Sequence, residues 1–402
     1  MGGPSKVNSG HRGSVTVPDI FAPTTVKQFL ARSWNKSLLH LPGKKGRFSA
    51  LLGWCELNRL LEECPQNPTH LRVMRRGKTI SHDFYLTRAK TLDAGALSSL
   101  LNQGATIVID FIDSILPTIG RIADAVADEL PARVWVNLYA TWGTESGLKL
   151  HSDSHDVIIL QIAGEKHWTV YGPTRINPNE DDVFEAPGAD VKPTWAGVLS
   201  DGDVLYIPRG WPHVAIPAGQ PSLHLTISLD QPTGSQYFRW LADELDKNSE
   251  VRAAVPQSIF KRKTSVWLGE MRELVQQSMT LPSVAAFLNH RDAERLARPR
   301  FSLPNFPIIP PNNWLADTTF RLATTRRLEL RDCEDGSVLA TSAGRRITCP
   351  ASLSPPLRRL SSNQPVRLDI LEKGLNPQAS QELRRTLAIM VQLGILFIED
   401  AT

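Results

Sequence analysis

The sequence predicts an α+β protein built around a small β-barrel, with helices on either side and a second small domain after them. Residues 133–230 form a series of short apolar or alternating segments separated by Gly and Pro turns, which is typical of antiparallel strands. Residues 51–63 and 116–130 instead carry apolar side chains at helical spacing. The chain is long enough to bury a large core in two or three domains.

The region before the barrel is expected to mix helices and strands. Residues 1–17 are rich in Gly, Ser, Lys and Arg, so we expect a disordered tail there. Residues 105–110 (Ala-Thr-Ile-Val-Ile-Asp) predict a buried strand, and the helix over 116–130 is predicted to end before Pro131. We take residues 18–232 as one domain, with residues 133–230 as its core.

The barrel region holds a triplet, His151-Ser152-Asp153, that can bind a metal ion. His213 follows Asp153 after sixty residues, beyond a short apolar strand and a Pro/Gly corner. Two imidazoles and one carboxylate form the facial triad that binds non-haem Fe(II) and leaves three coordination positions open. Residues i and i+2 of a strand face the same side, so His151 and Asp153 are predicted to lie on a strand, with Ser152 facing away.

The His-x-Asp pattern by itself is weak, because a chain with 10 His and 41 acidic residues contains it by chance. Its context strengthens the prediction. An apolar strand follows the triplet, turns at Gly164 and returns through an aromatic-rich strand that begins near Lys166. Residues 222–228 (Ser-Leu-His-Leu-Thr-Ile-Ser) alternate as a half-buried strand does. A β-barrel with a metal ion at its mouth follows from this arrangement.

The C-terminal part of the chain predicts two further pieces. Residues 233–297 are helical in pattern, and residues 298–311 are a Pro-rich, semi-rigid linker. Within residues 312–402, Glu334-Asp335-Gly336 is a hairpin signal. Residues 383–393 predict a helix capped by Gly394, and residues 395–398 predict a strand. A hairpin with a helix and a strand favours a small winged-helix-like domain.

These segments resemble the JmjC-type oxygenases, and among them the ribosomal-oxygenase-like, cupin-type group. The resemblance covers most of the chain, and its central motifs are the specific ones. They are Val-Asn-Leu-Tyr at 136–139, the triplet at 151–153, Leu-Gln-Ile-Ala-Gly-Glu-Lys-His-Trp at 160–168, Tyr-Ile-Pro-Arg-Gly-Trp-Pro-His at 206–213, and the strand at 222–228. Residues 29–39, 48–52 and 71–78 support the match.

The resemblance implies a double-stranded β-helix (jelly-roll or cupin) barrel that uses Fe(II), 2-oxoglutarate and O2 to hydroxylate a protein side chain. It makes His151, Asp153 and His213 the iron ligands, with no catalytic residue beyond them. Lys166 stands where the family places the cation that pairs with the distal carboxylate of 2-oxoglutarate. Three further residues stand at barrel-lining positions that contact the co-substrate or shape its pocket: Asn137, Tyr139 and Thr226.

Several alternatives stay open around this site. Lys149 and Arg209 are rival anchors for the co-substrate, although Arg209 fits a structural corner residue better. Metal-bound histidines need an acceptor for their second ring nitrogen, and Asp156 and Glu165 are the candidates. His155, His167 and His224 crowd the same region, and the sequence assigns none of them a separate role.

Two features depart from the family pattern. Ser152 occupies a position that is often aromatic, and residues 141–150 (Thr-Trp-Gly-Thr-Glu-Ser-Gly-Leu-Lys-Leu) replace a small Pro/Gly-rich loop. Both lie near the expected substrate entrance, so they bear on the choice of substrate. The leading hypothesis is hydroxylation of a protein or peptide, most naturally a ribosomal protein. The second is the same chemistry on a biosynthetic peptide or small metabolite.

A third hypothesis belongs to another class: a nucleic-acid-binding winged-helix protein with a degenerate barrel. The intact triad argues against it, and direct nucleic-acid binding is not expected from a net charge of only +4. Hydrophobic and charged contents of 41% and 21% are those of a soluble protein, and no segment predicts a membrane helix. Four scattered Cys fit free thiols in a reducing compartment, so we expect a cytoplasmic protein. In the resembling group the helices after the barrel mediate dimerisation, and we expect a homodimer; a packing collar is the alternative.

Overall fold

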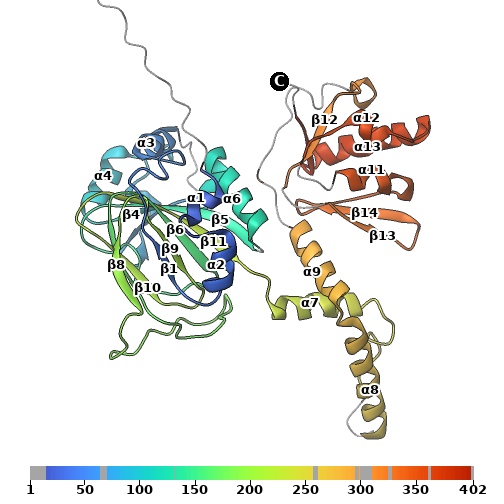
Figure 1. The fold of residues 1–402 in the computed structure, drawn as a ribbon, viewed down its shortest axis with the longest axis horizontal. Helices are drawn as coiled ribbons and strands as arrows, with labels where there is room; N and C mark the ends of the chain where they lie inside the picture. The colour runs from blue at the N-terminus through green and yellow to red at the C-terminus, as the bar shows by residue number, and fades with distance from the viewer. Residues whose placement is uncertain are drawn as a thin grey trace, which may run out of the picture. The chain divides into compact units, whose positions relative to one another are not determined.

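The computed structural model describes residues 15–63, 70–130, 132–256, 261–294, 298, 310–324, 328–360 and 364–399 (Figure 1). Most of the predicted tail and of the Pro-rich linker, together with Cys64, lies outside these residues. The chain divides into two compact units, Met1–Gln231 and Pro232–Thr402. No helix among the described residues is long and apolar enough to cross a membrane.

The first unit is built on two antiparallel sheets. The larger has the strand order β1-β9-β6-β11-β5-β4-β2-β3, and the smaller has the order β10-β7-β8. The bounds in the larger sheet are β1 Leu39–Leu41, β2 Leu71–Arg75, β3 Lys78–Thr79, β4 Thr106–Ile109, β5 Arg133–Thr141, β6 Asp156–Ala163, β9 Val204–Ile207 and β11 Ser222–Asp230. Those in the smaller are β7 Lys166–Val170, β8 Trp195–Leu199 and β10 His213–Pro217.

Helices cover the outer face of the larger sheet and bury its apolar side chains. Strand β6 shows the division: Ile158, Leu160 and Ile162 pack into the helical core, while Val157 and Ile159 pack against the smaller sheet. Because both faces of β6 are buried, residues 157–160 of the strand form an apolar run without alternation. The helices are α1 Val17–Phe21, α2 Val26–Arg32, α3 Trp54–Glu63, α4 Ala94–Asn102, α5 Ile112–Ile115 and α6 Pro117–Glu129, with a short 3-10 turn at His82–Phe84.

The second unit begins with α7 Gly234–Leu245, α8 Lys261–Ser278 and α9 Leu281–Ala293. A meander of β13 Glu329–Asp332, β14 Ser337–Ser342 and β15 Arg345–Pro350 follows, and its first turn confirms the predicted hairpin. A second small sheet has the order β16-β12-β17. Its strands and the adjoining helices are β12 Thr319–Leu322, α11 Ser354–Arg359, β16 Val366–Arg367, α12 Leu368–Glu372, α13 Pro377–Gln392 and β17 Leu396–Glu399.

Most predicted elements are confirmed, and one placement is wrong. The strand over residues 105–110 is β4, the helix over 116–130 is α6, and the helix and strand around Gly394 are α13 and β17. His151 and Asp153, however, do not lie on a strand. His151 forms one isolated bridge with His213, and β6 begins only at Asp156. The chain leaves the ladder between these points because the Asp153 carbonyl instead accepts a hydrogen bond of 2.8 Å from the Gly210 amide.

Candidate metal centre

Two turns bring the three predicted ligands together between the sheets. His151 and His213 exchange backbone hydrogen bonds of 3.2 and 2.8 Å, which fixes the two residues side by side. The corner before His213 turns at Gly210, whose φ is +77° and whose absent Cβ would lie 2.5 Å from the Arg175 carbonyl oxygen. Only glycine fits this corner without strain. The turn at Gly210 therefore places His213 beside the triplet.

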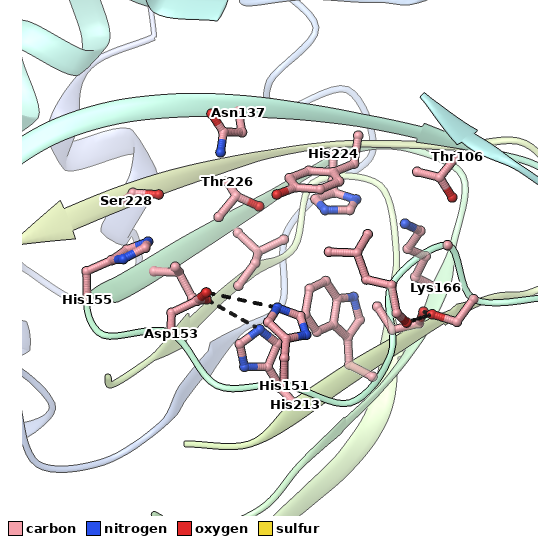
Figure 2. A pocket seen from close by; sticks show the side chains of 18 of the residues that line it. Thr106, Asn137, His151, Asp153, His155, Lys166, His213, His224, Thr226 and Ser228 are labelled. Carbon is pink, nitrogen blue, oxygen red and sulfur yellow. Dashed lines mark hydrogen bonds and ion pairs between the residues drawn. The ribbon is translucent and has the colours of Figure 1, made fainter. Parts of the chain in front are cut away.

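The side chains of His151, Asp153 and His213 converge on one point (Figure 2). One ligand atom of each lies within 4.8 Å of the others. The Nε2 atom of His213 is 3.6 Å from an Asp153 carboxylate oxygen, and the Nε2 atom of His151 is 4.0 Å from the other oxygen. These distances leave room between the three groups for a divalent metal ion, which imidazole and carboxylate ligands bind at about 2.0–2.2 Å.

Each ligand histidine is held through its second ring nitrogen by a backbone carbonyl. The Nδ1 atom of His151 is 2.8 Å from the Lys149 carbonyl oxygen, and that of His213 is 3.0 Å from the Trp211 carbonyl oxygen. A carbonyl only accepts, so each Nδ1 carries the proton and each Nε2 offers a lone pair to the centre. Burial, and then the nearby His151, lower the pKa of His213 to about 4, so its imidazole is neutral at neutral pH.

The predicted carboxylate acceptors for these histidines, Asp156 and Glu165, are therefore wrong. Asp156 is buried beneath the corner, where it accepts from the Tyr206 hydroxyl at 2.5 Å and from the Arg209 amide at 2.8 Å. Glu165 accepts from the Ser200 hydroxyl at 3.1 Å. Arg209 is a corner residue, as expected, and its side chain donates to Asn177.

All four predicted co-substrate residues line one cavity with the triad. The cavity has a volume of about 130 Å³. Asn137 and Thr226 face each other across β5 and β11, and Tyr139 pairs with His224 two residues along. Burial raises the pKa of the Tyr139 phenol, so it stays protonated. The rival anchor Lys149 is exposed, and neither it nor Arg209 lines the cavity.

Lys166 lies on one side of the triad, with Thr106 near it, while His155 and Ser228 lie on the other side (Figure 2). A turn at Gly164 (φ +68°) places Lys166 at the start of β7. The side chain is buried and makes no hydrogen bond or ion pair within the described parts of the chain. Burial lowers the pKa of Lys166 to about 7. A buried ammonium without a counter-charge is a binding site for an anion.

The two departures from the family pattern lie around the same cavity. Ser146, Gly147 and Leu148 of the loop at 141–150 line it. Ser152 instead lines a neighbouring cavity, together with Asp153, His155 and the loop at 174–185. Trp168 and His224 also line the cavity, and the sequence assigned neither of them a separate role, because an aromatic or imidazole ring on a barrel strand is ordinarily part of the packing.

Comparisons with known proteins agree with this geometry. Residues 113–237 match the model of the JmjC domain family. A Drosophila persimilis protein named bifunctional lysine-specific demethylase and histidyl-hydroxylase NO66 is 26% identical, over 69% of this chain and 42% of its own length. Ribosomal oxygenase 2 of Bos taurus is 30% identical, over 53% of this chain and 48% of its own. The chain thus spans less than half of each of these two relatives.

The fold is similar to that of a solved structure of YcfD, a ribosomal oxygenase from Escherichia coli in complex with cobalt and 2-oxoglutarate. The TM-score is 0.58, and the match covers 94% of this chain and 99% of that one at 16% identity. At this identity the likeness concerns the fold alone.

Proposed function

We propose that the protein, whose residues 113–237 match the model of the JmjC domain family, is an Fe(II)- and 2-oxoglutarate-dependent oxygenase. It hydroxylates a side chain of a protein or peptide and releases succinate and CO2. One observation carries the proposal: a single cavity holds a triad of two imidazoles and a carboxylate together with a buried lysine that makes no ion pair within the described residues.

The donor set fits a resident metal ion. His151, Asp153 and His213 hold it through two nitrogens and one oxygen, the set that suits Fe(II) with open coordination positions. Bound Fe(II) supplies O2 activation, which couples decarboxylation of 2-oxoglutarate to hydroxylation of a C–H bond. The protein's part is to orient the two imidazoles through the Lys149 and Trp211 carbonyls and to limit access of water.

Lys166 is the proposed anchor for the distal carboxylate of 2-oxoglutarate. Its ammonium is a compact charge in a partly dry site, where a charge-assisted hydrogen bond is strong. Asn137, Tyr139 and Thr226 bound the space between this charge and the triad. The cobalt and 2-oxoglutarate named for the YcfD structure support this assignment, since that protein shares the fold.

The proposed substrate is a protein, and a ribosomal protein is favoured by the names of the relatives. A biosynthetic peptide or small metabolite is the second candidate, because the unusual loop at 141–150 contributes three residues to the cavity. Mass spectrometry of ribosomal proteins from cells with and without the gene separates the two. Loss of one oxygen atom from a ribosomal peptide in the deletion strain supports the first candidate, and unchanged ribosomal proteins favour the second.

We also propose roles for the rest of the chain. Residues 312–402 are proposed as a winged-helix-like domain, and residues 233–297 as the contact of a homodimer in the cytoplasm. Light scattering of the purified chain tests the dimer. Nucleic-acid binding by the second unit is the competing function, and it predicts affinity for duplex DNA that falls steeply with salt. If the purified chain does not bind duplex DNA at low salt, this competing function is excluded.

A further inference from the structure

Lys166 and two polar groups near it share an unusual property: their side chains are buried and make no side-chain hydrogen bond within the described residues. Lys166, Trp168 and His224 are 5%, 5% and 3% exposed. Within the described chain, the Trp168 indole nitrogen and the His224 Nδ1 atom accept or donate no hydrogen bond, and Lys166 makes none either. All three line the cavity that contains the triad. Buried polar groups are nearly always satisfied, so two such atoms without a partner, beside a lysine that makes no ion pair in the described chain, indicate a missing ligand.

The chemistry of these groups defines the ligand. An ammonium and an indole N–H only donate hydrogen bonds, so the ligand must supply acceptors. Burial, and then the nearby Lys166, lower the pKa of His224 well below its ordinary value. His224 is therefore neutral and has one N–H to donate. A single positive charge surrounded by neutral donors matches one carboxylate group.

The strands hold these groups in fixed positions. Lys166 and Trp168 are alternate residues of β7, so both side chains face the cavity. His224 is on β11, opposite Tyr139 of β5, and their rings stack at 4.8 Å with an interplanar angle of 7°. The Trp168 ring meets the His224 ring edge to face at 5.7 Å. This packing fixes the plane of the imidazole, and in Figure 2 His224 lies on the side of the triad toward Lys166.

We propose that His224 is a second anchor of the co-substrate, donating a hydrogen bond to the distal carboxylate whose charge Lys166 balances, with the Trp168 indole N–H as a third donor. This inference rests on the proposed function and adds residues to it. Lys166 supplies the charge, and the stacked imidazole supplies direction. The site is thereby built for a dicarboxylate, with one carboxylate at this end and the other at the metal.

The test is calorimetric binding of 2-oxoglutarate to the Zn(II)-loaded full-length protein, which needs no turnover. We expect His224→Phe, which keeps the ring stack and removes the donor, to weaken binding about 10- to 100-fold, the effect of a lost charge-assisted hydrogen bond. His224→Asn keeps an N–H near the Nδ1 position and should restore binding to within about threefold of wild type. His155→Phe is the matched control, because it alters a histidine on the other side of the triad in the same cavity.

The outcomes separate the inference from the proposed function. Wild-type protein that does not bind 2-oxoglutarate overturns both. If Lys166→Met abolishes binding while His224→Phe binds as wild type does, the role of His224 is wrong and the proposed function stands. If His224→Phe and His155→Phe lose affinity for 2-oxoglutarate equally, the role of His224 is also overturned, since equal losses indicate a general change in the cavity. Loss in His224→Phe alone, with rescue by His224→Asn, supports it.

Discussion

Replacing Lys166 with Met should make the ligand-free protein more stable while it removes co-substrate binding. Methionine fills nearly the same volume without the charge. Lowering the pKa of Lys166 from its usual 10.5 to about 7 costs on the order of 4 kcal/mol of folding free energy at pH 7, since each pKa unit corresponds to about 1.4 kcal/mol. Removing the ammonium relieves that cost, so the variant gains up to this amount.

The sign of the pH dependence follows from the same shift. The pKa of Lys166 is lower in the folded state, so between pH 7 and pH 10.5 the unfolded chain binds more protons. Wild-type stability from this group therefore rises with pH, and the advantage of Lys166→Met shrinks. We expect about 4 kcal/mol at pH 7 and about 1–2 kcal/mol at pH 9.5. Urea unfolding of both proteins at the two pH values measures the difference.

The exposed Lys149 provides the control for this prediction. Lys149→Met removes a lysine from the same unit without relieving burial, so its stability should stay within about 0.5 kcal/mol of wild type. A Lys166→Met protein that is less stable than wild type at pH 7 would refute the reasoning. So would a gain that is equal at pH 7 and pH 9.5, because a packing effect does not depend on the titration of a lysine.

Three other predictions concern binding and the framework of the site. The affinity for 2-oxoglutarate should fall as pH rises above 7, by up to about tenfold per pH unit, because the carboxylate requires a protonated Lys166 whose pKa in the free protein is about 7. Calorimetry in two buffers of different ionisation enthalpy should detect the proton uptake that accompanies binding. An affinity that does not change with pH contradicts this prediction. Tyr206→Phe should destabilise the protein by about 1–3 kcal/mol, because the buried Asp156 loses a 2.5 Å hydrogen bond and the Asn35 amide loses its acceptor; a chemical denaturation midpoint equal to that of wild type contradicts it. Gly164→Ala should yield little folded protein, because φ is +68° and the added Cβ would lie 2.0 Å from the Pro221 carbonyl oxygen; a circular dichroism spectrum and melting temperature like those of wild type would show that the turn relaxes.

The parts of the site that the sequence predicted are those that depend on residue type and spacing. The His-x-Asp triplet and the distant His213 carry the side chains of a facial triad, and the resemblance to the JmjC-type oxygenases pointed to Lys166 after a Gly turn. The structure brings all four residues to one cavity. The resemblance also placed Asn137 and Thr226 at barrel-lining positions, and the structure shows that they pair across β5 and β11.

What the sequence did not predict depends on backbone partners and on long-range packing. Backbone carbonyls of Lys149 and Trp211 orient the ligand histidines, and every residue type has a carbonyl, so no sequence signal distinguishes these two. The departure of His151 and Asp153 from the strand depends on the bond from Gly210, which is distant in sequence. Helix α13 begins at Pro377, several residues before its apolar pattern, because Asn376 caps its first turn.

The sequence also could not predict that the His224 Nδ1 atom lacks a hydrogen-bond partner. An alternating strand pattern gives the direction in which a side chain points, but it does not say which groups surround that side chain. Trp168 and His224 look like ordinary barrel residues in the sequence. Only the packed structure shows that both rings contact each other and leave their nitrogens without partners.

The most direct test of the central claim is Fe(II)-dependent conversion of 2-oxoglutarate to succinate by the purified protein, compared with Asp153→Ala. Asp153 contributes the carboxylate of the triad, and no other acidic side chain joins the two histidines in that group within the described residues. We predict slow uncoupled turnover that requires added iron, rises with a ribosomal extract and disappears in the variant. Turnover that persists in Asp153→Ala would contradict the assignment of this cavity as an oxygenase site. A wild-type protein that shows no turnover and binds neither the metal nor 2-oxoglutarate would contradict it as well.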